Sequence, residues 1–106
     1  MKKVSEKDMT PGSIQGEKGI VDVYDIIQEE VTAGVRVVQP NSDVPIRPHV
    51  HHERQVIYVI SGSGKITNGK ETFDLHSGDF IILSAEEEHY VITESEELKV
   101  FEVKYP

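Results

Sequence analysis

The apolar residues of this chain are dominated by side chains that branch at Cβ. There are 14 Val and 11 Ile residues, but only 3 Leu and 2 Ala. Branching at Cβ suits the pleated surface of a strand and restricts side-chain rotation in a helix. No segment shows a sustained helical period with capping residues, and turn residues recur about every eight to twelve positions. The sequence therefore predicts an all-β fold of two antiparallel sheets, either a sandwich or a barrel.

The length of 106 residues is enough for one domain and too short for two separate cores. Residues 1–19 are charged and interrupted by proline and glycine, so we expect an amino-terminal arm with no core of its own. Residues 20–106 are expected to form a single barrel, with its strongest strand at 55–61 and others that include 46–51 and 98–105. The Asn68-Gly69 pair predicts a two-residue type I′ hairpin turn, because both central positions of that turn need a positive φ.

Charge and composition exclude several classes of partner. The chain has 19 acidic and 11 basic residues, which gives a net charge of −8 with histidine neutral. A field of that sign repels phosphate backbones and anionic lipid heads, so we expect neither a nucleic acid nor a membrane partner. There is no cysteine, which excludes disulfides and thiolate chemistry. The opening Met-Lys-Lys leads into polar residues and not into an apolar run, and we therefore expect a cytoplasmic protein.

Five histidines are the candidates for chemistry: His49, His51, His52, His76 and His89. His49 and His51 lie two positions apart in the expected 46–51 strand, so their imidazoles should point to the same face. At a Cα spacing of about 6–7 Å, two such imidazoles can share one cation. The alternative is a hydrogen-bonded cluster of histidines without a metal. We expect His52 on the surface and His76 in a turn.

From residue 43 to residue 93 the chain resembles the two sequence motifs of the cupin superfamily, which consists of small jelly-roll β-barrels. The first family motif is Gly, five residues, His-x-His, three or four residues, Glu, six residues and Gly. The second is Gly, five residues, Pro-x-Gly, two residues, His, three residues and Asn. The matching positions here are Asp43, His49, His51, Gln55 and Gly62, then Gly78, Ser84, Glu86, His89 and Thr93. The resemblance implies a cupin-type double-stranded β-helix, a jelly-roll barrel of two antiparallel sheets.

The resemblance also implies a metal site formed by His49, His51 and His89, with Gln55 in the place of the family's Glu. Gln55 either ligates the ion or accepts a hydrogen bond from a bound water. Without the carboxylate, a divalent centre is a stronger Lewis acid and favours anionic or enediolate-like ligands. Some cupins that look like this, with three His and one Gln, bind manganese, iron or nickel. We expect one divalent transition metal, Mn, Fe, Ni or Zn, since several first-row ions suit these donors.

Two residues are candidates for binding a substrate. Arg47 shares the expected strand parity of His49 and His51, so two orientations are open for its guanidinium. It either enters the barrel mouth and holds a substrate carboxylate, or it is an edge residue that extends to solvent or pairs with Asp43. In the last strand we expect Phe101 to point inward, where it would form part of an apolar pocket wall around the metal.

Two functions from different classes fit these residues. The first is a metalloenzyme of the dioxygenase, isomerase, decarboxylase or lyase type that acts on a small oxygen-rich or anionic organic molecule. The second is a non-enzymatic module that binds a small molecule or a metal. Apolar residues on the outer face, such as Val56, Tyr58 and Ile60, predict a homodimer in which the amino-terminal arm is exchanged or packed across.

Overall fold

The computed structural model describes all 106 residues and contains ten β-strands, one 3-10 turn at Glu6–Asp8 and no α-helix. The strands are β1 (Gly12–Gln15), β2 (Ile20–Gln28), β3 (Thr32–Val38), β4 (Asp43–Val44), β5 (Arg54–Gly62), β6 (Gly64–Thr67), β7 (Thr72–Leu75), β8 (Phe80–Leu83), β9 (Tyr90–Ile92) and β10 (Leu98–Tyr105). The predicted all-β class is confirmed. None of the elements is a helix of the length and apolar character needed to cross a bilayer.

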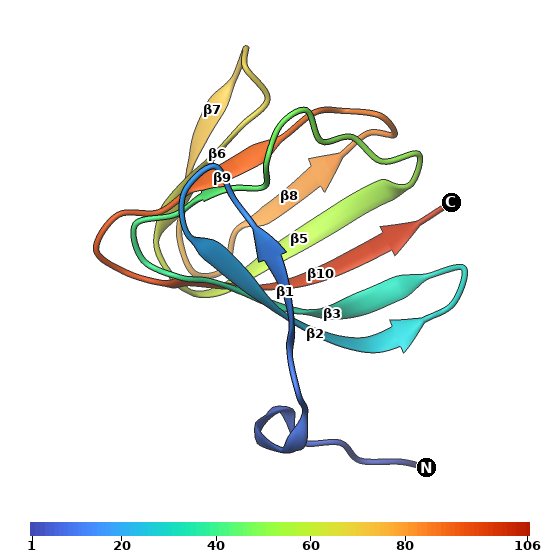
Figure 1. Ribbon diagram of the computed structural model, residues 1–106. Helices are drawn as coiled ribbons and strands as arrows, with labels where there is room; N and C mark the ends of the chain where they lie inside the picture. Colours follow the sequence, from blue (N-terminus) through green and yellow to red (C-terminus); the bar gives the residue numbers. More distant parts are fainter.

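The strands form two antiparallel sheets that enclose the interior (Figure 1). The six-stranded sheet has the order β1-β2-β3-β10-β5-β8, and the four-stranded sheet has the order β4-β9-β6-β7. Most neighbours are distant in sequence, since β10 lies between β3 and β5 while β9 lies between β4 and β6. The chain therefore crosses repeatedly from one sheet to the other, and the predicted jelly-roll barrel of two antiparallel sheets is confirmed.

The core lies between the two sheets. β5 alternates as the period of a strand requires, with Gln55, Ile57 and Val59 buried while Tyr58 and Ile60 are exposed. The buried cluster consists of Val21, Val38, Val44, Ile57, Val59, Ile66, Leu75, Leu83, Leu98 and Val100. Ile and Val supply most of this cluster, as the bias toward Cβ-branched residues indicated. The inward face of β5 also carries Gln55, a polar residue among apolar ones.

Residues 46–51, predicted as a strand, form an irregular loop between β4 and β5. Pro45 and Pro48 have no N–H group to donate to a ladder, and a strand at this place would lack those hydrogen bonds. The pairing occurs just before the loop, where Asp43 lies opposite Ile92 and Val44 opposite Val91. His49 and His51 are therefore held by a loop and not by a regular strand.

The Asn68-Gly69 pair turns the chain, but the predicted two-residue type I′ turn is wrong. Thr67 pairs with Thr72, so the loop has four residues, and within it only Gly69 has a positive φ, of 90°. The Asn68 side chain explains the difference, because its Oδ1 accepts hydrogen bonds from two later backbone N–H groups at 2.9 and 2.7 Å. An asparagine that binds its own turn in this way closes a longer loop.

The amino-terminal segment joins the barrel earlier than expected. β1 is the outer strand of the six-stranded sheet, with Ile14 opposite Val21, and Ile14 packs against the core. Only the residues before β1 extend away from the sheets (Figure 1), and Glu6 there lies 3.0 Å from Lys99 Nζ of the same chain. The barrel thus begins at residue 12 and not at residue 20. Ile14 is a single apolar residue in a glycine-rich stretch, which is too little to show a strand period.

Candidate metal centre

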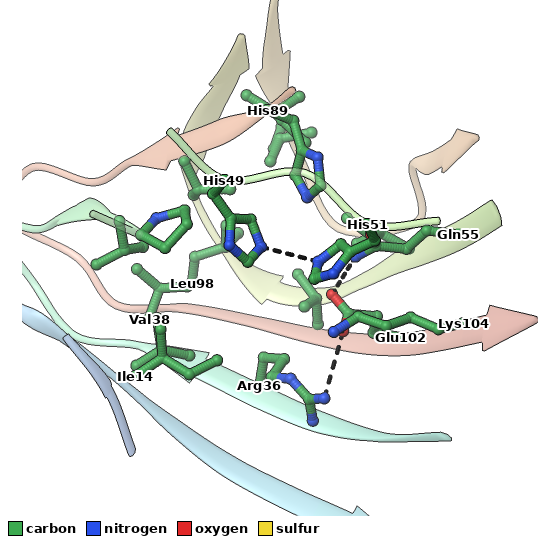
Figure 2. Close-up of a pocket in the computed structure, with 18 residues that line it drawn as sticks. Ile14, Arg36, Val38, His49, His51, Gln55, His89, Leu98, Glu102 and Lys104 are labelled. Atoms are coloured by element: carbon green, nitrogen blue, oxygen red, sulfur yellow. Dashed lines mark hydrogen bonds and ion pairs between the residues drawn. The ribbon is translucent and has the colours of Figure 1, made fainter. Parts of the chain in front are cut away.

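Three imidazole side chains converge beside the barrel interior (Figure 2). His49 and His51 come from the loop before β5, and His89 is the residue before β9. Nε2 of His49 and Nε2 of His51 are 2.8 Å apart. The ring centroid of His89 lies 5.7 Å from that of His49 and 5.8 Å from that of His51. The three histidines that the sequence singled out therefore lie together, with one ring nitrogen of each within 4.8 Å of the others.

This spacing suits a single metal ion. Two nitrogens at about 2.1 Å from an ion and at right angles to each other are about 3.0 Å apart, close to the 2.8 Å found here. Burial, then the charge of Lys104 and the neighbouring histidines, lowers the pKa of His51 to about 4. Burial also lowers the pKa of His49, with His89 and Lys104 acting in the same direction. Both imidazoles are neutral at pH 7, which is the form that binds a metal.

His89 is oriented by the loop that precedes it. Its Nδ1 lies 3.0 Å from the carbonyl oxygen of Glu87, a distance at which Nδ1–H donates and leaves Nε2 free for a ligand. The Glu87 carboxylate in turn accepts hydrogen bonds from the Ser84 backbone N–H and from Asn68 Nδ2, both at 3.0 Å. The bond from Asn68, followed by that from Ser84, lowers the pKa of Glu87. The loop thus fixes both the tautomer and the direction of the His89 ring.

Gln55 lies inside the barrel beside His51, with 3% of its surface exposed (Figure 2). Its Nε2 donates a hydrogen bond of 2.5 Å to Oε1 of Glu102 on β10. A carboxylate oxygen only accepts, so the amide presents its nitrogen to Glu102 and keeps its oxygen for another partner. That oxygen suits either a metal ion or a bound water, and both roles that the sequence left open for Gln55 stay open.

Glu102 belongs to a buried ion-pair network that sequence reasoning missed. Its Oε2 lies 3.3 Å from Arg36 Nη2 and 3.6 Å from Lys104 Nζ, and Arg36 Nη1 donates to Asp25 Oδ1 at 2.6 Å. None of these four side chains is more than 17% exposed. The signal was available in the parity of β10, because Glu102 falls two positions after the apolar Val100 and shares its inward face.

The expectation that Phe101 points inward was wrong. Phe101 is 38% exposed, and it lies between Val35 and Tyr58 on the outer face of the six-stranded sheet. Its neighbours Val100 and Glu102 are the buried residues of β10. The error came from aiming the aromatic ring at the core and the carboxylate at solvent, whereas the network of counter-charges lets Glu102 be buried.

Arg47 takes the second of its two predicted orientations. Its guanidinium pairs with the Asp43 carboxylate and lies over the Tyr90 ring, 3.6 Å from the ring centroid. The strand parity that would have carried it into the barrel mouth does not exist, because residues 46–51 form a loop. His52 lies on the surface as predicted, with its side chain 93% exposed, and His76, predicted in a turn, directly precedes the turn at Ser77-Gly78 with its side chain 73% exposed.

The three imidazoles face a cavity of about 90 Å³ between the sheets. Most of its wall is apolar, and its polar part is formed by the histidines with Gln55, Glu102, Arg36 and Lys104. The apolar wall consists of Ile14, Val21, Val38, Val44, Pro45, Ile57, Ile66, Leu75, Val91, Leu98 and Val100. A small molecule bound here would meet ring nitrogens that could hold a metal, charged groups and an apolar surface together.

A family model described as "Cupin domain" matches residues 34–104, which is more than half of the chain. The chain belongs to the cupin family. No curated protein matches this cupin significantly by sequence. The two motifs that the sequence analysis identified lie within the matched range.

Three solved structures illustrate what this cupin is similar to. The polyketide cyclase RemF from Streptomyces resistomycificus is 21% identical, with a TM-score of 0.80 over 98% of this chain and 78% of that one. A predicted oxalate decarboxylase from Thermotoga maritima is 17% identical, with a TM-score of 0.83 over 98% of both chains. The cupin domain of an XRE family transcriptional regulator from Enterobacter cloacae is 13% identical, with a TM-score of 0.70 over 81% of this chain and 96% of that one. At these identities the likeness shows the fold alone.

Two of the departures from the family motifs, at Glu86 and Thr93, have structural explanations. Gly62 keeps the family's glycine, with a φ of 85° and no room for a Cβ, which would lie 1.9 Å from the Glu97 carbonyl oxygen. Glu86 stands where the family has a glycine and also has a positive φ, of 61°. Thr93 stands in the place of the family's Asn, and its Oγ1 accepts from the Ser42 backbone N–H and donates to the Gln39 carbonyl. The backbone of this cupin therefore keeps the motif's shape with other residues.

Proposed function

We propose that this cupin is a metalloenzyme that holds one divalent transition-metal ion through His49, His51 and His89. The observation that carries the proposal is the close approach of three ring nitrogens, two of them 2.8 Å apart on imidazoles whose pKa burial has lowered. The oxygen of Gln55 is the fourth candidate donor. Such a set of nitrogen and neutral oxygen ligands suits Mn, Fe, Ni or Zn.

We further propose that the substrate is a small, oxygen-rich, anionic organic molecule. A divalent ion among neutral ligands carries an uncompensated charge in a largely apolar cavity, and an anionic oxygen ligand would offset that charge. The cavity volume of about 90 Å³ is in keeping with a small organic molecule.

The charged groups of the cavity favour a proton-transfer reaction of the isomerase, lyase or decarboxylase type. When bound, the ion would polarise a substrate oxygen and make the adjacent bonds easier to ionise or break. Glu102 is the only carboxylate among the residues that line the cavity, and it would take up or return the proton.

Metal analysis of the purified protein tests the centre directly. The protein should contain about one transition-metal ion per chain, and His49→Ala and His51→Ala should lose it while circular dichroism shows an intact barrel. His52→Ala and His76→Ala are the matched controls, because both side chains are exposed and far less enclosed than the three candidates. Wild-type metal content in His49→Ala and His51→Ala would contradict the proposed centre.

Activity is tested on the metal-loaded protein with oxalate, 2-keto acids and 1,3-diketones. Proton transfer predicts decarboxylation or incorporation of solvent deuterium, seen by NMR, without consumption of O₂. Both signals should disappear in His49→Ala. Turnover that survives removal of the ion would contradict a metalloenzyme, and carboxylate binding without any turnover would assign a non-enzymatic binding module instead.

We also propose that two copies associate through the outer face of the six-stranded sheet. The register places Phe101, Tyr58 and Phe80 in one row across β10, β5 and β8, and all three are exposed. The Tyr58 and Phe80 rings are 4.7 Å apart at their centroids. A continuous apolar row of this kind on an open sheet face is typical of an interface.

A further inference from the structure

The ionic side chains that line the cavity beside the histidines include more cations than anions, although the whole protein is acidic. The ionic side chains that line it are Arg36, Lys104 and Glu102, two cations and one anion, whereas the chain as a whole carries −8. A divalent ion at the histidines would add two more positive charges to the same space. Asp25, just outside the lining, offsets the charge of Arg36, so the excess positive charge in this space would be that of the ion. In a region with an apolar wall, an anion from outside the protein would offset it.

Arg36 and Lys104 differ in how many hydrogen-bond and ion-pair partners each has within the chain. Arg36 is 6% exposed and is held on both sides, by Asp25 at 2.6 Å and by Glu102 at 3.3 Å. The Lys104 side chain makes no hydrogen bond within the chain, and its only ion-pair partner is Glu102 Oε2 at 3.6 Å. That carboxylate already receives the short bond from Gln55. The Lys104 ammonium is therefore the cation whose three N–H donors are available to a ligand.

We propose that Lys104 binds a carboxylate group of the substrate, at the opposite end of the molecule from the oxygen that faces the three histidines. Lys104 lines the same cavity as His49, His51 and His89, and Figure 2 shows it beside Glu102. This is the role that the sequence suggested for Arg47, which the structure instead pairs with Asp43. The substrate class is thus a short carboxylic acid with a second oxygen donor. The inference rests on the proposed metal centre.

The experiment is a pair of calorimetric titrations on the full chain, first with Ni²⁺ and then, on the Ni²⁺-loaded protein, with oxalate. Oxamide, the neutral diamide of the same shape, is the control probe. The variants are Lys104→Met, which keeps the length of the side chain without its charge, and Lys104→Arg, which keeps the charge. Lys70→Met removes an equal charge from an exposed turn and is the matched control.

Wild type should bind oxalate more tightly than oxamide. Lys104→Met should weaken oxalate binding at least tenfold, as loss of a charge pair predicts. It should leave oxamide binding unchanged, because oxamide carries no charge. Ni²⁺ binding should be equal or tighter, because the variant lacks the Lys104 ammonium that repels the ion. Lys104→Arg and Lys70→Met should bind oxalate within about threefold of wild type, well inside one tenfold step.

Equal oxalate affinity in wild type and Lys104→Met overturns the assignment of Lys104 while leaving the metal centre intact. A metal-loaded wild type that binds no oxalate also overturns the assignment of Lys104. Failure of wild type to bind Ni²⁺ in the first titration removes the proposed metal centre, and the assignment with it. Weaker Ni²⁺ binding in Lys104→Met, together with a lower melting temperature, shows a structural role and also overturns it.

Discussion

The backbone at Glu86 is held in a conformation that favours glycine. Its φ is 61°, which costs an L-residue about 1–2 kcal/mol. Its N–H donates to the His51 carbonyl at 2.5 Å, so this strained turn connects the two histidine-bearing segments. Glu86→Gly should therefore raise the free energy of unfolding by about 0.5–1 kcal/mol, after the greater unfolded-state entropy of glycine is subtracted. Urea denaturation measures the change.

Glu86→Ala is the control for this prediction. It removes the same carboxylate and the exposed contact with His52, but it keeps the Cβ that makes a positive φ unfavourable. The alanine variant should show no gain in stability. Equal stability of Glu86→Gly and Glu86→Ala would mean that the turn is not strained at this residue.

His51 makes the metal-free protein sensitive to acid. Burial and the nearby charges lower its pKa to about 4 in the folded state, against 6.5 in the unfolded chain. Between these values the unfolded state binds the extra proton, so protonation favours unfolding. The free energy of unfolding should be fully retained above pH 6.5 and should fall as the pH is lowered toward 4. Urea denaturation of the EDTA-treated protein at several pH values measures this dependence.

His51→Gln isolates that dependence, because glutamine keeps hydrogen-bonding atoms and does not titrate. The variant should lose stability less steeply than wild type between pH 6.5 and 4, whatever its stability at pH 7. Carboxylates elsewhere affect both proteins alike and cancel from the comparison. Identical slopes would contradict a lowered pKa at His51.

At the scale of the strands, the pairing of β5 with β10 brings the Gln55 side chain to within 2.5 Å of the Glu102 carboxylate. Gln55→Glu alone would bring two carboxylates to hydrogen-bond distance, where one has to take up a proton. The cost of that protonation then offsets the tighter metal binding that a carboxylate ligand would give. The double variant Gln55→Glu/Glu102→Gln restores the hydrogen bond with donor and acceptor exchanged. It should bind Ni²⁺ about tenfold more tightly than Gln55→Glu, a difference of about 1.4 kcal/mol in binding free energy.

Glu102→Gln completes this double-mutant cycle. By itself it removes the charge partner of Arg36 and Lys104 and should weaken Ni²⁺ binding or destabilise the barrel. Rescue by the second substitution would not occur if the two residues acted separately. Additive effects on Ni²⁺ affinity would therefore show that Glu102 does not orient the Gln55 side chain.

The strands also show why part of the site could be predicted and part could not. His49, His51 and His89 were identifiable because the motif spacing fixes which loops meet. The pairing of Val44 with Val91 brings the end of β4 to the start of β9, and Gln55 pairs with Leu83 at the other side of the same loops. The direction of Arg47 was not identifiable, because strand parity has no meaning in a proline-interrupted loop.

The buried charges were missed for a different reason. A sequence assigns a lone Glu or Arg to solvent, since burial of an unpaired charge is unfavourable. Arg36 and Glu102 are buried because they lie on β3 and β10, which are neighbours in the sheet although far apart in sequence. Only the strand order β3-β10-β5 brings the counter-charges and Gln55 together, and no local pattern contains that order.

For the whole molecule, the six-stranded sheet has two faces with different proposed functions. Its inner face carries Arg36, Gln55 and Glu102 toward the cavity, and its outer face presents aromatic and branched residues to solvent. A second apolar row, Val103, Val56 and Ile82, lies beside the row of Phe101, Tyr58 and Phe80. β8 is also an edge strand, with one side of its backbone unpaired. Both features favour association of copies over a free monomer in solution.

Light scattering after size exclusion should therefore give twice the chain mass of 11.9 kDa. Ile82 is 75% exposed and lies on the edge strand, so Ile82→Lys should place a charge in the apolar contact and shift the protein to monomer at micromolar concentration. Phe73→Lys is the matched control, because Phe73 is an apolar residue, 51% exposed, on the opposite sheet. It should remain dimeric. A wild-type mass of one chain, or dissociation by Phe73→Lys alone, would contradict an interface on the outer face of the six-stranded sheet.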